Sequence, residues 1–183
     1  MIIEKVEKYC SQLLKEASCK ALPFHNLKHT QEVVENCITI ASRLKLDHAE
    51  QEPIIIASWF HDTGHIVCYQ AHEAESQRLA KDFLEKLFYP SDQLNIILGC
   101  IAATKMPQKP RNKSEEIICD ADIMHIATPH FFYSKLLLRR EWELVFNKTY
   151  SDKEWHQMNY DFLKSGTFFT QCEENNLEKG RQE

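Results

Sequence analysis

Residues 54–65 read Ile-Ile-Ile-Ala-Ser-Trp-Phe-His-Asp-Thr-Gly-His, an apolar run that ends in His61 and Asp62. The apolar run is far too short to span a bilayer, and Pro53 before it suits the first turn of a helix. We therefore expect a buried helix over about 54–61. Two adjacent polar side chains at the end of a buried helix are costly unless they have partners.

The rest of the chain favours helices around this segment. Only 4 Gly and 6 Pro occur in 183 residues, fewer turn residues than a sheet-rich fold of this size needs. Hydrophobic residues make up 43% and charged residues 27%, a balance typical of one soluble domain with a sizeable core. We predict an all-α, single-domain helical bundle. Apolar periodicity and turn residues place its other helices at about 2–19, 25–46, 71–88, 92–103, 130–147 and 151–165.

Charge and cysteine content exclude several classes of protein. The formal net charge is −5 and no basic stripe is present, so nucleic acid is not an expected partner. The N-terminal residues MIIEKVEKYC carry charges where a signal peptide needs an apolar run. Seven cysteines, odd in number and widely spaced, are typical of a reducing compartment. We expect a cytoplasmic protein with no membrane segment.

Further histidines and carboxylates stand at the ends of the predicted helices. His25 and His29 are four residues apart, a spacing that places both on one helix face. His65 follows the His61–Asp62 pair, and two more groups come later, His72-Glu73 and Asp120-Ala121-Asp122. Imidazole and carboxylate together suit a divalent cation such as Mn, Fe, Ni, Co, Zn or Mg. Each group alone is weak, whereas the ordered set predicts a metal site.

This ordered set resembles the HD superfamily of metal-dependent phosphohydrolases. PFHNLKHTQEVV, WFHDTGH and ICDADI are similar to its three ligand motifs, and HEAES is similar to a segment that follows the His-Asp dyad in several members. IAATKMPQKP and LLLRREWE are similar to a bacterial subgroup of predicted HD hydrolases. The resemblance covers roughly residues 20–170. It implies an HD-type domain over 1–170, and the polar residues that follow predict a tail or linker over 171–183.

The resemblance also implies roles for individual residues. The metal ligands would be His29, His61, Asp62 and Asp122, while Asp120 would brace the last of these. The ion would polarise a phosphoryl oxygen and lower the pKa of a bound water. The remaining catalytic residues would lie over the phosphate of a small phosphorylated substrate such as a nucleotide; they are His65, His72, Glu73 and Lys105, with Arg111 as a further cation.

Three alternatives remain open at this point. Two-metal HD enzymes use extra histidines after the dyad, often one where this chain has Ala102 to Lys105, so one ion is expected rather than two. An HD fold can also serve as a nucleotide-binding or sensor module with little or no catalysis, although the complete ligand set favours the enzyme. Oxygen chemistry at a di-iron site is the most distant option. The sequence does not indicate the exact substrate or the oligomeric state.

Overall fold

The fold is all-α, as predicted. The structure, a computed structural model, describes residues 1–16, 22–165 and 168–170, and these contain helices but no strands. The prediction of a polar tail over 171–183 lies outside the described residues. In chain order the elements are α1 (Ile2–Glu16), α2 (Leu27–Arg43), α3 (His48–Phe60), the 3₁₀ helix η2 (Thr63–Ile66), α4 (His72–Lys86), α5 (Ser91–Ala103), α6 (Lys113–Ile123), the 3₁₀ helix η3 (Met124–Ala127), α7 (Phe131–Phe146) and α8 (Asp152–Ser165).

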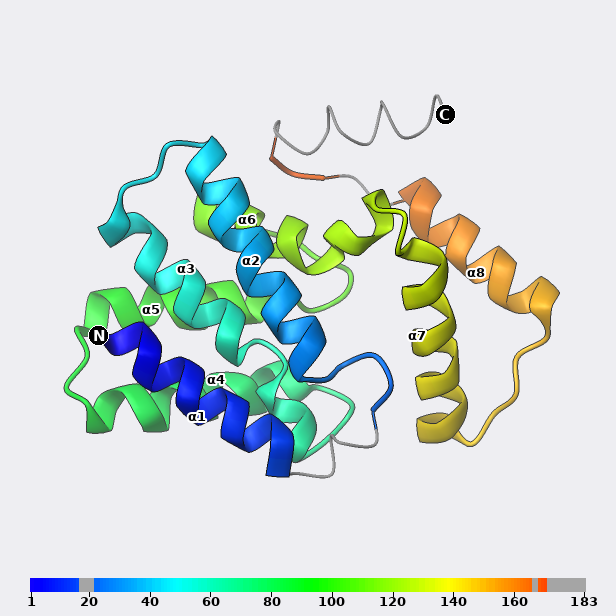
Figure 1. Ribbon diagram of the computed structural model, residues 1–183, viewed down its shortest axis with the longest axis horizontal. Coiled ribbons are helices and arrows are strands. Elements are labelled where there is room, and N and C mark those ends of the chain that lie inside the picture. The colour runs from blue at the N-terminus through cyan, green and yellow to red at the C-terminus, as the bar shows by residue number, and fades with distance from the viewer. Residues whose placement is uncertain (17–21, 166–167, 171–183) are drawn as a thin grey trace.

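Helix α3 is the centre of the bundle. Every residue from Pro53 to Phe60 is buried, and α3 contacts α1, α2, α4, α5 and α6 (Figure 1). A helix that is apolar on all sides needs such a cover. Its C-terminal end therefore delivers His61 and Asp62 into the interior.

Two helix starts differ from those predicted, and a capping box sets the first of them. Asp47 accepts a hydrogen bond from Glu50 N at 2.9 Å, and the Glu50 side chain accepts one from Asp47 N at 2.8 Å. This capping box starts α3 at His48, so Pro53 lies inside the helix and not in its first turn. Helix α5 begins at Ser91, one residue before the predicted start, and Pro90 precedes it without a side-chain cap.

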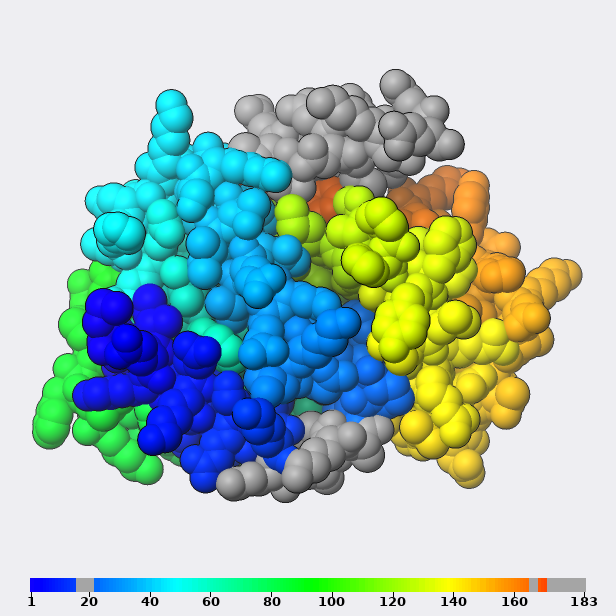
Figure 2. All heavy atoms as spheres, in the orientation of Figure 1, coloured from blue at the N-terminus to red at the C-terminus, as the bar shows by residue number. Residues whose placement is uncertain are grey.

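Helices α7 and α8 form a second layer beside the main bundle (Figure 1). They are joined by an aromatic cluster in which the Trp142 and Trp155 rings meet edge to face at 5.6 Å. In Figure 2, α7 (yellow) lies against the segment that leads into α2 (blue). This contact contains a buried carboxylate from α7, Glu141, which accepts hydrogen bonds from the backbone N–H groups of Phe24 and His25.

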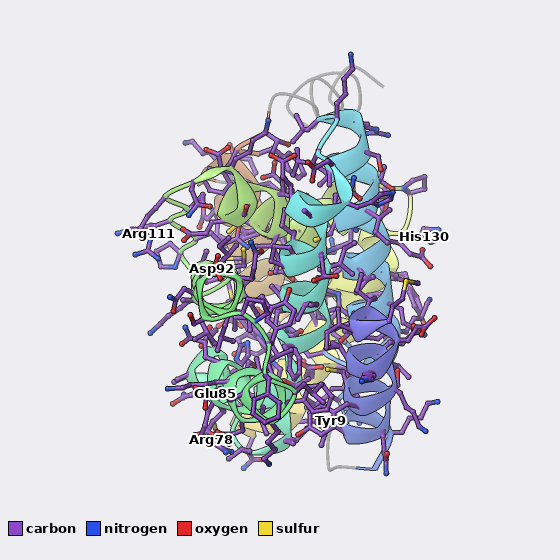
Figure 3. All side chains as sticks on the ribbon, turned by 90° about the vertical axis from the view of Figure 1, so that its left-hand side faces the viewer. Tyr9, Arg78, Glu85, Asp92, Arg111 and His130 are labelled. Carbon is purple, nitrogen blue, oxygen red and sulfur yellow. The ribbon has the colours of Figure 1, made fainter. Side chains whose placement is uncertain are left out.

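Charged side chains lie at the periphery. Arg78 and Arg111, at two edges of the molecule in Figure 3, are 52% and 74% exposed. Among the described residues, no helix is both long enough and apolar enough to cross a membrane. A cluster of buried histidines and aspartates, by contrast, lies where α2, α3 and α6 meet.

Candidate metal centre and active site

His29 is positioned by the first turn of α2. The Asn26 side chain accepts hydrogen bonds from Lys28 N at 2.9 Å and His29 N at 3.4 Å, so it caps the helix. His25 consequently lies outside α2, and the prediction that it shares a helix face with His29 is wrong. The imidazole of His29 points inward and is 5% exposed.

His61 closes α3 and its ring orientation is fixed by the backbone. Its Nδ1 lies 2.8 Å from the carbonyl oxygen of Ser58. A carbonyl can only accept, so Nδ1 carries the hydrogen and Nε2 keeps its lone pair. Nε2 lies 3.2 Å from Oδ2 of Asp62, the next residue.

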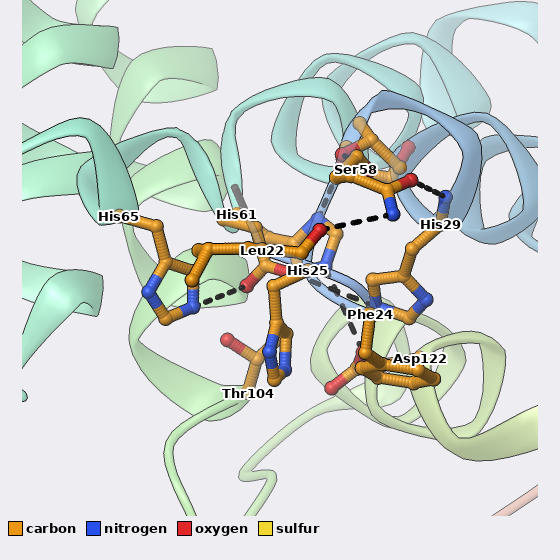
Figure 4. A network of polar contacts seen from close by, with 12 residues as sticks. Leu22, Phe24, His25, His29, Ser58, His61, His65, Thr104 and Asp122 are labelled. Carbon is orange, nitrogen blue, oxygen red and sulfur yellow. Dashed lines mark hydrogen bonds and ion pairs between the residues drawn. The ribbon is translucent and has the colours of Figure 1, made fainter. Parts of the chain in front are cut away.

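Asp122 reaches the same point from α6. Its Oδ1 lies 3.2 Å from His29 Nε2 and 3.6 Å from His61 Nε2 (Figure 4). Its Oδ2 accepts a hydrogen bond of 3.3 Å from Gln108. Asp62 Oδ2 in turn lies 3.6 Å from His29 Nε2. The structure thus brings together the four residues predicted as metal ligands.

Two atoms of this cluster test whether it suits a cation. His61 Nε2 and Asp62 Oδ2 are buried, and neither has a hydrogen-bond partner within the described part of the chain. Buried polar atoms without partners are costly. One ligand atom each from His29, His61 and Asp122 lies within 4.8 Å of the others. A divalent cation fits this arrangement because it satisfies these atoms together.

Electrostatics keep the two carboxylates of the cluster ionised, and these carboxylates in turn stabilise positive charge at His61. Burial lowers the pKa of His61, but Asp62 and Asp122 outweigh it and the net pKa is raised. Burial raises the pKa of both carboxyl groups, yet neighbouring histidines outweigh it and hold each pKa below its usual range. In His65 burial prevails and lowers the pKa to about 3. The carboxylates are therefore ionised at neutral pH and His65 is neutral.

The predicted catalytic histidines lie on the other side of Asp62. His65 and His72 are stacked with ring centroids 3.7 Å apart. His72 Nε2 is 3.3 Å from Asp62 Oδ1 and 4.0 Å from Glu73 Oε1. Three of the four predicted catalytic residues are thus at the site.

Lys105, the fourth, is separate from them. It is exposed just after the end of α5, and none of the ion pairs among the described residues includes it. Arg111 forms an ion pair of 3.1 Å with Glu115. The structure therefore gives neither side chain a contact with the site.

The turn after Asp62 is held by a hydroxyl. Ser76 Oγ donates to the carbonyl oxygen of His61 at 2.6 Å and accepts from Gly64 N at 2.8 Å. Ser76 is fully buried on α4. This pair of hydrogen bonds ties the dyad to the helix that carries His72.

Two residues at the site were not assigned roles from the sequence. Glu141 is fully buried and contacts His25 and Tyr69, whose hydroxyl donates to Oε1 at 2.8 Å. No sequence signal distinguishes Glu141, because the 131–146 segment also contains Lys135, Arg139, Arg140 and Glu143. His125, which belongs to none of the motifs in the sequence, lies with its ring 5.2 Å from that of Phe24.

A cavity of about 240 Å³ adjoins His29 between α2, η3 and α7. Its lining is aromatic and polar, and it has one Lys and one Glu, Lys28 and Glu32, which form an ion pair of 3.5 Å. The cavity therefore offers little net charge. Other lining residues include Phe24, Asn26, Asn36, His125, Tyr133 and Ser134.

Comparisons with known proteins agree with this architecture. The family profile described as HD domain matches residues 26–141, more than half of the chain. The structure is similar to the crystal structure of a predicted HD superfamily hydrolase from an uncultured Thermotogales bacterium, with a TM-score of 0.62 and 18% identity over 87% of this chain and 86% of that one. At this identity the likeness shows the fold alone. No curated protein matches the chain significantly.

Proposed function

The chain belongs to the HD domain family, and on that premise we propose that it hydrolyses a phosphoester in a nucleotide or related small phosphorylated molecule. A divalent ion would be held by His29, His61, Asp62 and Asp122. When bound, such an ion polarises a phosphoryl oxygen and lowers the pKa of a coordinated water.

One observation carries the proposal. Three separate segments, the start of α2, the end of α3 and the end of α6, place two imidazoles and two carboxylates at one point, with His61 Nε2 and Asp62 Oδ2 unsatisfied there. A structural core has no use for two buried polar atoms without partners. In a site that binds a cation, by contrast, both atoms act as ligands.

His72 and Glu73 act on the substrate in this proposal. His72 Nε2 lies 3.3 Å from Asp62 Oδ1, so it is next to the ligand cluster, and its side chain is 18% exposed. The ring is oriented by the Tyr69 carbonyl oxygen, 3.2 Å from Nδ1, while Glu73 Oε1, 4.0 Å from Nε2, stabilises the protonated imidazole. His72 then protonates the leaving oxygen, the usual task of a positioned imidazole. His65, stacked beneath it, fixes the plane of the ring.

The cavity next to His29 supports a nucleotide-sized substrate. Its lining includes the rings of Phe24, His125 and Tyr133 and has little net charge. Neutral aromatic walls suit a base or sugar better than a second phosphate. The charged phosphate would lie on the metal side and the uncharged part in the cavity.

Metal content and turnover should be measured together. We would compare the wild type with the double variant His61→Ala/Asp62→Ala, using Mn²⁺ with nucleotides, cyclic nucleotides and a generic phosphodiester. His48→Ala, an exposed histidine at the start of α3, is the control. We expect bound metal and phosphoester cleavage in the wild type and the control, and neither in the double variant.

The other outcomes contradict the proposal in different ways. Metal without cleavage of any of these substrates would favour a nucleotide-binding or sensor module. Absence of metal from the wild type would remove the basis for both functions. Cleavage that persists in the double variant would place the chemistry elsewhere.

A further inference from the structure

Helix α7 presents an apolar face to solvent. Phe132, Tyr133 and Leu136 are 70%, 59% and 57% exposed, and Leu144 is 52% exposed. Their spacing places them along one side of the helix, and Arg140 lies between Leu136 and Leu144. We call these five residues the α7 face. Exposed apolar residues that cluster in this way indicate a binding surface.

The α7 face carries positive charge. Arg140 is exposed, and Lys135 holds its ammonium nitrogen 5.0 Å from the centre of the Phe132 ring. Lys148, two residues after the end of the helix, is also exposed. Among the residues that the structure describes, none of these three cations forms an ion pair. Their charge is therefore available to a partner.

All residues of α7 are described, and no exposed acidic side chain among them offsets this charge. The helix has two acidic residues. Glu141 is fully buried, and the Glu143 side chain is 20% exposed with its Oε1 3.2 Å from Arg139 Nε. The chain as a whole has a formal net charge of −5. The positive charge of the α7 face is thus a local feature, and it attracts an anionic partner.

A second copy of this chain fits the α7 face poorly. In an isologous pair both subunits present the same patch, so Arg140 would lie near its own symmetry mate and the two would repel. The apolar area is also small. Aromatic side chains bury about 150–250 Å² each when fully covered and leucines no more, so four side chains at 52% to 70% exposure offer roughly 300–700 Å². A stable protein–protein interface buries about 800 Å² on each partner.

We propose that the α7 face docks on the surface of an anionic lipid bilayer. Phe132, Tyr133 and Leu136 enter the boundary between headgroups and acyl chains, where aromatic rings and leucine are favoured. Lys135 and Arg140, beside them, meet the lipid phosphate groups. Insertion of a few side chains needs no matching groove and little area. This is peripheral binding by one face of a folded helix, and it requires no membrane-spanning segment.

Docking in this way orients the candidate active site toward the bilayer. The start of α7 lies at an edge of the molecule, where Figure 3 shows His130. His130 and Tyr133 also line the cavity beside His29. The α7 face and this cavity therefore adjoin, so a docked molecule holds the cavity close to the lipid surface. The inference concerns where the protein acts and does not depend on the proposed function.

The test is co-sedimentation of the full chain with vesicles. Vesicles of phosphatidylcholine alone are compared with vesicles of phosphatidylcholine mixed with phosphatidylserine, at low and high salt. We expect the wild type to bind only the mixed vesicles and to be released by salt. Phe132→Ser/Leu136→Ser should lose at least about tenfold in binding, because the apolar insertion is gone. Arg140→Ala should lose about fivefold, since one cation no longer meets the headgroups.

Phe88 provides the matched control. It is 94% exposed and lies between α4 and α5, outside the α7 face. Phe88→Ser should bind vesicles as the wild type does. Phe132→Trp adds a local probe, whose fluorescence should shift to the blue on addition of mixed vesicles, whereas that of Phe88→Trp should not. Thermal unfolding checks that each variant keeps the fold.

Several outcomes would overturn the proposal. The wild type could fail to bind mixed vesicles, or Phe132→Ser/Leu136→Ser could bind them as well as the wild type. A dimer in analytical ultracentrifugation that dissociates in this double variant would assign the α7 face to a second copy. Binding to soluble polyglutamate but not to vesicles would assign it to an acidic protein. The double variant should keep the wild-type metal content, so failure of docking is distinguishable from failure of the proposed function.

Discussion

The backbone of Gly64 lies directly against His72. A Cβ atom added to Gly64 would be 1.9 Å from the carbonyl oxygen of His72 and 2.8 Å from the backbone nitrogen of Ser76. Both of these atoms belong to the first turns of α4, so no side-chain rotation can relieve the clash. This close approach places the turn after Asp62 next to the start of α4, so that Asp62 and His72 lie at the same site.

Gly64→Ala should therefore damage both stability and the site. The substitution must displace α4, and overpacking of this kind costs about 1–3 kcal/mol or more. For a chain of this length we expect the thermal midpoint to fall by roughly 2–4 °C per kcal/mol. Calorimetry with and without Mn²⁺ measures both effects.

Gly99→Ala is the matched control. Its Cβ would meet a side-chain atom, the carboxylate tip of Glu115, at 3.0 Å and no backbone atom at a shorter distance, and alanine in a helix gains about 0.5–1 kcal/mol over glycine. We expect a midpoint close to that of the wild type. If Gly64→Ala and Gly99→Ala had the same thermal midpoints with and without Mn²⁺, the Gly64 contact would not constrain the site.

Metal removal should lower stability. An ion that binds only the folded chain stabilises it by about 2.7 kcal/mol at a concentration 100 times its dissociation constant. At the size of this chain, that corresponds to a rise of roughly 5–10 °C in the thermal midpoint. The rise should appear on addition of Mn²⁺ to chelator-treated protein and be absent in Asp62→Ala. A midpoint that is insensitive to Mn²⁺ in the wild type would argue against a buried metal site.

Local patterns in the sequence were sufficient for the fold class and the family. The apolar run of α3 predicts a buried helix, and the ordered histidines and aspartates predict which residues converge. Helix ends were less predictable, because a capping side chain competes with the periodic pattern. Asn26 caps the start of α2 and so leaves His25 outside the helix predicted from residue 25, and Asp47 with Glu50 starts α3 six residues before Ile54.

The outer part of the site depends on contacts that no local pattern records. Glu141 and His25 are 116 residues apart, and their hydrogen bonds exist only because α7 packs beside the segment that precedes α2. Neither helical periodicity nor a short motif marks such a pair. The same holds for His125, which joins the cavity beside His29 through the placement of η3.

Glu73→Ala should separate binding from turnover. Glu73 lies 4.0 Å from His72 Nε2 but is not part of the four-residue cluster, so metal content should be unchanged. Loss of a protonated donor costs about 10²- to 10⁴-fold in rate. Single-turnover assays at saturating Mn²⁺ measure this loss. Glu75→Ala, on the same helix and paired with Arg78, should keep the wild-type rate. Full activity in Glu73→Ala would remove this residue from the mechanism.

The two aspartates of α6 should differ in function although they are two residues apart. Asp122 Oδ1 faces His29 Nε2, whereas Asp120 is fully buried and accepts hydrogen bonds from Phe169 N at 2.8 Å and Thr170 N at 2.7 Å. Asp122→Ala should therefore lose the metal, and Asp120→Ala should keep it. This difference tests directly which of the two predicted carboxylates is the ligand.

Asp120→Ala should instead weaken the attachment of the 168–170 segment to α6. The N–H groups of Thr170, which is buried, and Phe169, which is half-buried, lose their acceptor, which costs about 1–3 kcal/mol for a buried group left without a partner. We expect a lower thermal midpoint and faster cleavage by a protease near residue 168, with Mn²⁺ stoichiometry as in the wild type. If Asp120→Ala lost metal as completely as Asp122→Ala, Asp120 itself would be needed to bind the ion, and the bracing role would be wrong.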